Sequence, residues 1–237
     1  MYYLKTVAAN LGIELSPSQI EQFSIYYEEL LEWNERINLT SITDSREVQI
    51  KHFLDSLSVS LALKQPIADR SFLDVGAGGG FPGLPLKIAF PAIKLVLLEA
   101  TARKAAFLRH LTQKLALDDV DIVVGRAEDI AHQARYRQRF DIVLCRAVAQ
   151  LPALAELTLP FCAIGGRLIA QKKGNIDAEI DRATKAIEVM GGSQPLVKKV
   201  ELGELAGERY LVIVDKIAPT PDKYPRRPGI PAKRPIV

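Results

Sequence analysis

The first quarter of the chain carries hydrophobic residues at the spacing of helices. Ser16, Pro17 and Gln19 have the spacing of a capping box, so a helix should begin at Pro17. Its apolar residues recur every three or four positions and form one stripe: Ile20, Phe23, Tyr26, Tyr27, Leu30, Leu31 and Trp33. A second helix, continuous or broken, is expected from residue 44 or 45 to about residue 63. Residues 1–64 are therefore predicted to be a helical region whose aromatic side chains lie in a core rather than on nucleic-acid bases.

From residue 65 the pattern changes to short apolar runs that alternate with helical segments. Strands are predicted at 72–75, 95–98, 121–124, 140–146 and 165–171, with helices at 82–90, 101–117 and 177–190. Such alternation is typical of a parallel sheet. Two last runs, 197–200 and 209–214, predict a hairpin-like pair at the sheet edge. The expected architecture is α/β, a Rossmann-like and mostly parallel seven-stranded sheet over residues 65–217 with an N-terminal helical extension.

A glycine-rich turn follows the first predicted strand. Asp74 lies at the end of that strand, and four glycines lie within residues 76–80. Glycine accepts a positive φ and lets the backbone approach a ligand closely. In an α/β sheet, a turn of this kind at a strand end binds a nucleotide-like ligand. Residues 78–83 also fit the loose G-x-G-x-x-G pattern of dinucleotide-binding proteins.

The position of the acidic residue favours a different cofactor. In the dinucleotide motif the turn starts directly after the strand, whereas here Asp74 precedes the first glycine, Gly76. Asp74-x-Gly76-x-Gly78-x-Gly80 resembles motif I of the class I methyltransferases that use S-adenosylmethionine (SAM). SAM has no pyrophosphate for a helix N-terminus to hold, but it has a cationic amino-acid end that Asp74 would suit. We therefore expect SAM rather than a nicotinamide dinucleotide, with Asp74, Gly76 and Gly78 in its site.

Two further strand ends can complete such a site. Glu99 ends the second predicted strand, 25 residues after Asp74, where a carboxylate can accept both ribose hydroxyls of an adenosine. The alternative for Glu99 is a solvated helix cap. The third strand leads into residues 125–129, where a backbone N–H and a carboxylate can recognise the adenine edge. Ala127 and Glu128 are assigned to the cofactor site for this reason.

The charge distribution bears on the partner. The net charge of +3 conceals values of −4 over residues 1–64, +5 over 101–173 and +4 over 219–237. A polyanion would therefore meet the middle and the C-terminal end of the chain, although chance scatter explains the middle segment equally well. Residues 218–237 are treated as a separate basic, proline-rich tail. Six prolines within 219–237 predict an extended segment, which is either a floppy end or a site of phosphate contact.

Composition excludes several other classes. No apolar run is long enough to span a membrane, and the first fifteen residues lack the features of a signal peptide. The two cysteines, Cys145 and Cys162, form no metal-ligand cluster, and a disulfide is not expected. We expect a cytoplasmic protein without a membrane partner or a metal, and a monomer.

The end of the fourth predicted strand carries the chemistry. Enzymes that methylate exocyclic amino groups have an Asn/Asp-Pro-Pro-aromatic turn there, which this chain lacks. Enzymes that methylate pyrimidine C5 need a nucleophilic cysteine, but Cys145 lies between Leu144 and Arg146 and is interpreted as a buried strand residue. Arg146 stays protonated and cannot act as a base. The acceptor should then need no deprotonation, as is true of guanine N7, and we expect direct methyl transfer without a covalent enzyme intermediate.

A resemblance covers essentially the whole chain. Its motifs are residues 38–41, 52–56, 74–83, 146–147, 173–174, 207–209 and 224–229. Together they resemble the RsmG (GidB) family of bacterial 16S rRNA guanine-N7 methyltransferases. The resemblance implies transfer of a methyl group from SAM to N7 of one guanine in the 530 loop of 16S rRNA. The substrate would be that RNA, the 30S subunit or an assembly intermediate.

The resemblance also implies roles for single residues. It implies cofactor contacts at Gly76, Phe81, Ala127, Glu128 and Arg146. It makes His52, Lys173 and Arg209 candidates for RNA or active-site contacts. Some members of the family carry Asp at the position of Glu99, but the longer carboxylate can still reach a ribose.

Two other functional classes stay open on the sequence. One is a methyltransferase for small molecules or proteins on the same core; the basic tail and the lack of a second substrate domain speak against it. The other is a protein of this fold that binds RNA without catalysis, against which the intact glycine motif argues.

Overall fold

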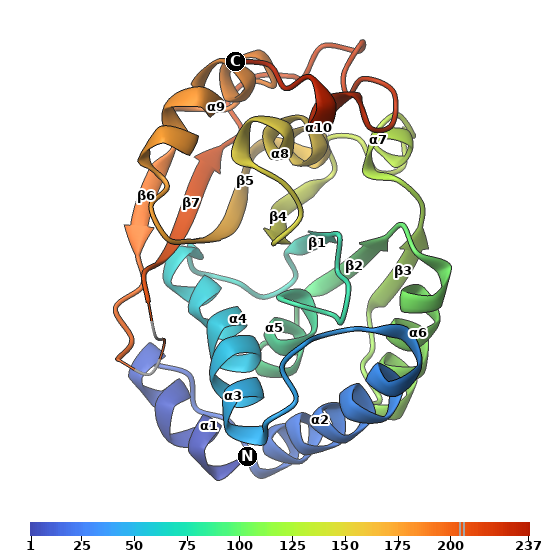
Figure 1. Cartoon of the computed structure of the whole chain (residues 1–237), viewed down its shortest axis with the longest axis vertical. Helices are drawn as coiled ribbons and strands as arrows, with labels where there is room; N and C mark the ends of the chain where they lie inside the picture. Colours follow the sequence, from blue (N-terminus) through green and yellow to red (C-terminus); the bar gives the residue numbers. More distant parts are fainter. Residues whose placement is uncertain (204, 206) are drawn as a thin grey trace.

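The computed structural model describes residues 1–203, 205 and 207–237 of the chain. Its centre is one sheet of seven strands in the order β3-β2-β1-β4-β5-β7-β6 (Figure 1). Neighbouring strands run parallel, except that β7 is antiparallel to both β5 and β6. The strands are β1 Ser71–Val75, β2 Lys94–Glu99, β3 Val120–Val124, β4 Phe140–Arg146, β5 Cys162–Lys173, β6 Leu196–Lys199 and β7 Arg209–Asp215. The predicted seven-stranded, mostly parallel sheet is therefore confirmed, and so is the antiparallel pair at its edge.

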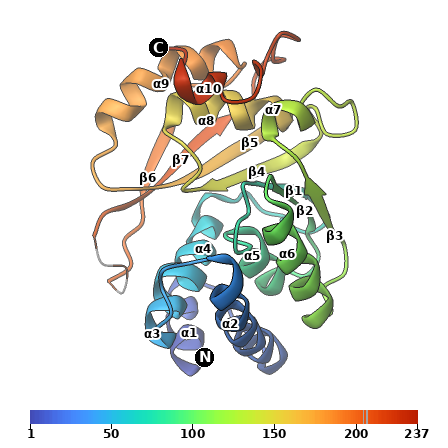
Figure 2. The same cartoon turned by 45° about the vertical axis from the view of Figure 1, so that its right-hand side comes forward.

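Helices cover both faces of the sheet, as Figures 1 and 2 show. One face lies against α4, α5 and α6, with α1, α2 and α3 outside them; the other lies against α8 and α9, with the C-terminal segment beyond. The helices are α1 Tyr2–Ala8, α2 Pro17–Ile37, α3 Ser45–Val48, α4 Asp55–Leu57, α5 Gly83–Ala89, α6 Ala102–Lys114, α7 Ala127–Ile130, α8 Leu151–Thr158, α9 Asp177–Val189 and α10 Ile230–Lys233. The helices predicted at 82–90, 101–117 and 177–190 are thus present as α5, α6 and α9.

Strand alternation divides the hydrophobic core into two parts. On β4, Ile142 and Leu144 pack among the N-terminal helices, whereas Val143 and Cys145 pack against the α8–α9 side. Successive side chains of a strand point to opposite faces. Arg146, the last residue of β4, therefore shares the face of Ile142 and Leu144. This places its guanidinium toward the N-terminal helices.

The N-terminal region has the predicted helices and one feature that sequence patterns did not specify. The capping box of α2 is complete: Ser16 Oγ accepts from the Gln19 amide, and Gln19 Oε1 accepts from the Ser16 amide. Phe23 and Tyr26 are fully buried, which confirms that the aromatic stripe is core. The second helix runs from α3 into α4 through a π-helical turn, η2 (Gln49–Leu54). The break is thus a change of helical pitch rather than a gap.

The C-terminal segment packs onto the α8 side of the sheet. The prediction of an extended chain is wrong for much of the segment, which contains turns, bends and the short helix α10, and a floppy end is contradicted. Glu156 of α8 is fully buried and accepts four hydrogen bonds from the Arg226 backbone and guanidinium, at 2.6–3.1 Å. Arg137 donates to the carbonyls of Thr220, Pro221 and Tyr224. At least one tail arginine is therefore used inside the protein and is not free for a phosphate.

This ion pair gives a test of the packing. We expect Arg226→Ala to lower the free energy of unfolding by about 3 kcal/mol, because it leaves the buried Glu156 carboxylate without its partner. Urea denaturation measures the change. Arg227→Ala alters an exposed arginine next to it and should change stability by less than about 0.5 kcal/mol. Equal, small effects of the two substitutions would contradict this packing.

Candidate active site

The glycine turn joins β1 to α5 in a left-handed backbone conformation. The φ angles of Gly76, Gly78 and Gly80 are +74°, +58° and +93°, values that residues with a Cβ seldom adopt. A Cβ at Gly80 would lie 2.6 Å from both Leu84 and Tyr26, whereas one at Gly78 would meet only a backbone oxygen at 3.8 Å. The turn is therefore tightly packed at Gly80 and open at Gly78, where a ligand can approach.

Two buried carboxylates hold this turn from below. Asp74 Oδ2 accepts from the Gly83 amide at 2.8 Å. Glu99 accepts from the amides of Gly78 and Thr101 at 2.9 and 2.8 Å. Burial raises the pKa of Asp74 to about 7, although the Gly83 hydrogen bond and Arg146 act in the opposite direction. Both acids lie at or next to strand ends as predicted. Glu99 is buried and accepts from the amide of Thr101, the residue before α6, so the alternative of a solvated cap is contradicted.

The segment after β3 contacts the C-terminal segment. Glu128 is buried, and its Oε1 accepts from the Gly229 amide at 2.9 Å. Ala127 next to it is half-buried at the start of α7. The Glu128 carboxylate thus anchors the C-terminal segment through one of its two oxygens.

Phe81, which follows the four glycines, is the centre of an aromatic cluster. Its ring stacks on Tyr26 with centroids 5.3 Å apart and on His52 at 4.6 Å. Tyr26 comes from α2, and its hydroxyl donates to the Gly79 carbonyl at 2.5 Å. The Arg146 guanidinium carbon lies 4.8 Å from the Phe81 ring centroid, a favourable cation–π distance. The helical extension thus supplies two of the rings that fix the turn.

The Arg146 guanidinium is enclosed by acceptors from the π-helical turn and from α4. Nη1 donates to the Lys51 carbonyl and to Asp55 Oδ2, both at 3.1 Å, and Nη2 lies 3.3 Å from His52 Nδ1. In a regular α-helix the Lys51 carbonyl would accept from the Asp55 amide. Here that amide bonds to the carbonyls of Ile50 and His52 instead, so the Lys51 carbonyl is available to Arg146. π-helical turns are frequent at functional sites for reasons of this kind.

His52 lies among polar groups that include the Arg146 guanidinium. Its Nδ1 is 3.1 Å from the Lys51 carbonyl and 3.3 Å from Arg146 Nη2, and its Nε2 is 2.7 Å from Thr40 Oγ1. Burial, and after it the charge of Arg146, lower the pKa of His52 to about 4. His52 therefore carries no charge at neutral pH. The structure brings it to Arg146, as expected for an active-site contact.

Lys173 and Arg209 lie at the same sheet end. They are cross-strand partners, the last residue of β5 and the first of β7. Arg209 Nε lies 3.7 Å from Asp55 Oδ1, and the Lys173 side chain is exposed. Burial raises the pKa of Asp55, whereas Arg146, Arg209 and Lys173 lower it. The Asp55 carboxylate thus faces three cations.

The sequence prediction missed Asp55 and Gln171. Gln171 Nε2 donates to the Asp55 carbonyl at 2.6 Å. The signal for Gln171 was strand alternation, since every second residue back from Lys173 faces the N-terminal helices. Asp55 lies three residues after His52, a spacing that places both on one helix face.

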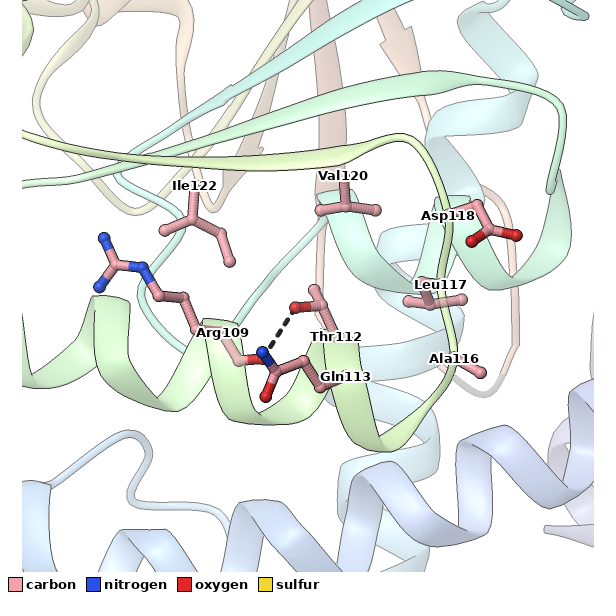
Figure 3. Close-up of a pocket in the computed structure, with 8 residues that line it drawn as sticks. All are labelled: Arg109, Thr112, Gln113, Ala116, Leu117, Asp118, Val120 and Ile122. Atoms are coloured by element: carbon pink, nitrogen blue, oxygen red, sulfur yellow. Dashed lines mark hydrogen bonds between the residues drawn. The ribbon is translucent and has the colours of Figure 1, made fainter.

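Other features lie away from this site. Cys145 is buried on the opposite face of β4, and burial raises the pKa of its thiol, so the interpretation as a strand residue is confirmed. A hollow of about 430 Å³ beside α6 and β3 (Figure 3) is lined by residues from Arg109 to Ile122. It contains none of the predicted site residues. It lies beside the amino end of β3, whereas ligands of such sheets bind at the carboxyl ends of the strands.

No helix within residues 1–203, 205 and 207–237, which the structure describes, is long and apolar enough to cross a membrane. Within the same residues, no group of three or more His, Cys, Asp or Glu side chains is placed to hold a metal ion.

The strand order, the glycine turn after β1 and the acidic end of β2 define a class I SAM-dependent methyltransferase fold. Solved structures agree. An O-methyltransferase from Bacillus cereus in complex with SAH superposes with a TM-score of 0.55 at 22% identity, over 81% of this chain and 90% of that one. A predicted O-methyltransferase from Agrobacterium tumefaciens gives 0.54 at 16% identity, over 70% and 80%. At these identities the likeness shows the fold alone.

Sequence comparison identifies the family. The GidB family, described as rRNA small subunit methyltransferase G, matches residues 19–209. A protein from Dehalococcoides mccartyi named ribosomal RNA small subunit methyltransferase G is 58% identical over 227 residues, 96% of each chain. A protein of the same name from Roseiflexus castenholzii is 47% identical over 99% of each chain. The chain belongs to the rRNA small subunit methyltransferase G family, and the predicted resemblance is confirmed.

The buried neutral His52 predicts a pH dependence of stability. Its pKa is about 4 in the folded protein and about 6.5 in an unfolded chain. Between these values only the unfolded chain binds the proton, so this group lowers stability by about 1–2 kcal/mol as the pH falls from 7 to 5. We expect His52→Gln to lose less stability than the wild type over this range in urea titrations. Parallel losses in the two proteins would contradict the assignment.

Proposed function

We propose that the protein transfers the methyl group of SAM to N7 of a guanine in the 530 loop of 16S rRNA, in the cytoplasm. Membership of the rRNA small subunit methyltransferase G family supports the class of substrate. The observation that carries the choice of acceptor is the Arg146 site, in which an arginine and a neutral histidine flank Phe81. Arg146 cannot accept a proton, and His52 beside it, with a pKa of about 4, is a weak base, so an acceptor that has no proton to lose fits best.

The residues at the glycine turn fit SAM. Asp74 Oδ1 is buried and, among the described residues, has no hydrogen-bond partner; an ammonium group is the kind of donor that it lacks. We propose that Asp74 suits the amino-acid end, that Glu99 accepts the ribose hydroxyls, and that Gly76, Gly78 and Phe81 form the floor. Ala127 and Glu128 would contact the adenine through their backbone. When bound, SAM supplies a methyl group on a sulfonium that makes it electrophilic.

The protein's own groups then position the acceptor and control charge. A guanine base from a single-stranded loop can be splayed into the site, as in other enzymes that act on bases. Its N7 lone pair would form the new carbon–nitrogen bond as the methyl–sulfur bond breaks, the sulfur would keep that electron pair and leave as the thioether, and no proton would leave. We propose that Arg146 orients the base through O6 and that positioning and water exclusion supply most of the rate. Cys145 faces the other side of the sheet, which supports direct transfer without a covalent intermediate.

The surroundings of the site suit an RNA. Arg146, Arg209 and Lys173 face one carboxylate, Asp55, and His52 is neutral. A cationic cluster at the mouth of the site attracts phosphates and lowers affinity at high salt. We propose that His52, Lys173 and Arg209 contact the RNA.

The experiment that tests this function is transfer of labelled methyl from SAM to 30S subunits from cells that lack this gene, followed by mapping of the modified base. We expect one N7-methylguanine, in the 530 loop. Label on another nucleotide would replace the proposed target. Label on free nucleosides or peptides in the absence of RNA would favour another methyltransferase class, and tight SAM binding without any transfer would favour a protein that only binds RNA.

Arg146 provides the sharpest variant. We expect Arg146→Ala to reduce single-turnover methylation by at least about 10²-fold, because a positioned charged donor is lost, while circular dichroism shows the fold retained. Arg146→Lys keeps the charge without the planar donor set and should be only partly active. Arg36→Ala, at an exposed arginine of α2, is the control. Normal turnover in Arg146→Ala would exclude this role.

A further inference from the structure

Asp55 occupies the space between the two arginines of the site. Its Oδ2 accepts from Arg146 at 3.1 Å, and its Oδ1 lies 3.7 Å from Arg209 Nε, beyond hydrogen-bond distance. The relative solvent exposure of Asp55 is 7%. No hydrogen bond to its Oδ1 is made by any residue that the structure describes. Asp55 Oδ1 therefore has no hydrogen-bond donor from the described residues and can accept from a ligand.

A second unpartnered acceptor lies next to it. Gln171 is 7% exposed, and its Nε2 donates to the Asp55 carbonyl. Its Oε1 is buried and has no partner among the residues of the described chain. Buried acceptors are normally satisfied by a donor from the protein, from water or from a ligand. Asp55 and Gln171 are joined by the Nε2–carbonyl hydrogen bond, and each carries a side-chain oxygen without a donor among the described residues.

The chemistry of these oxygens indicates what they would bind. The Watson–Crick edge of guanine presents the N1–H and the exocyclic 2-amino group side by side, a set of donors that suits a carboxylate. Adenine presents an acceptor at N1 and has no 2-amino group, and pyrimidines lack this arrangement. The opposite edge of guanine carries O6 and N7, which suits a cation. An arginine and a carboxylate in contact can therefore address the two edges of one guanine.

We propose that Asp55 is a specificity-determining residue that accepts hydrogen bonds from N1–H and the 2-amino group of the target guanine, with Gln171 Oε1 beside it. The inference rests on the proposed function, since it assumes a guanine acceptor at Arg146. Arg209, 21% exposed and only loosely paired with Asp55, moves aside toward the RNA backbone as the base enters.

A simpler role for Asp55 would be to orient Arg146. In that case its loss would slow the reaction equally for every base that presents N7 and O6. Inosine distinguishes the two roles, because it has N7, O6 and N1–H but lacks the 2-amino group. The fold-change in rate caused by removing the 2-amino group, measured with and without the Asp55 carboxylate, shows whether that amino group and the carboxylate are in contact.

The test compares kcat/KM on 30S particles reconstituted with 16S rRNA that carries guanosine or inosine at the mapped target. We expect the wild type to lose about 10- to 100-fold on inosine, the range for a hydrogen bond to a charged group. The Asp55→Asn variant should have a lower kcat/KM on guanosine than the wild type. Its kcat/KM on inosine should be less than about threefold lower than its own value on guanosine. Asp181→Asn, an exposed acid on α9, should behave as the wild type does.

Each outcome decides the proposal. Equal losses on inosine in the wild type and in Asp55→Asn would show that Asp55 acts only through Arg146 and would overturn it. A wild type that methylates inosine as fast as guanosine would also overturn it, and this result needs no variant to fold. Failure of the wild type to methylate guanosine at N7 would instead refute the proposed function.

Discussion

The largely buried charge of Arg146, whose side chain is 16% exposed, is the constraint on which the candidate site depends. A guanidinium cannot lose its proton at any physiological pH, so a fold that places one beside Phe81 must give it polar partners. The three polar groups that it contacts, the Lys51 carbonyl, Asp55 and His52, all come from the helical extension and none from the core sheet. The extension is therefore part of the proposed active site.

The glycine turn is held in the same manner by distant segments. Tyr26 of α2 bonds the Gly79 carbonyl, Glu99 of β2 bonds the Gly78 amide, and Asp74 of β1 bonds the Gly83 amide. Left-handed glycines alone would allow many conformations, and these three bonds select one. Phe81 then couples the turn to Arg146, so the proposed cofactor and RNA sites share one aromatic ring. Rigid positioning of this kind is what a reaction without proton transfer requires.

Much of the fold was predictable because it follows local rules. The capping box at Ser16, the strand at 140–146 and the glycine turn each depend on a few neighbouring residues. The π-helical turn was not predictable, because the carbonyl that it leaves free, at Lys51, accepts from Arg146, 95 residues away. Asp55 was missed for the same reason: its spacing to His52 is unremarkable until β4 places an arginine against it.

The C-terminal segment shows what composition alone does not predict. Six prolines and five basic residues suggested an extended chain for phosphate contact. A single buried acid, Glu156, uses one of those arginines and ties the segment to the core, and Glu128 adds a second attachment. Charge counts cannot distinguish a cation that faces solvent from one that completes an interior pair.

The most direct test of the shared site is a crystal structure of the protein with S-adenosylhomocysteine. We expect the ribose hydroxyls to bond to the Glu99 carboxylate, in place of its hydrogen bond from the Gly78 amide. We expect the sulfur to lie beside Phe81, on the side of Arg146. Ligand in the hollow beside α6, or a sulfur out of van der Waals reach of the Phe81–Arg146 pair, would contradict it.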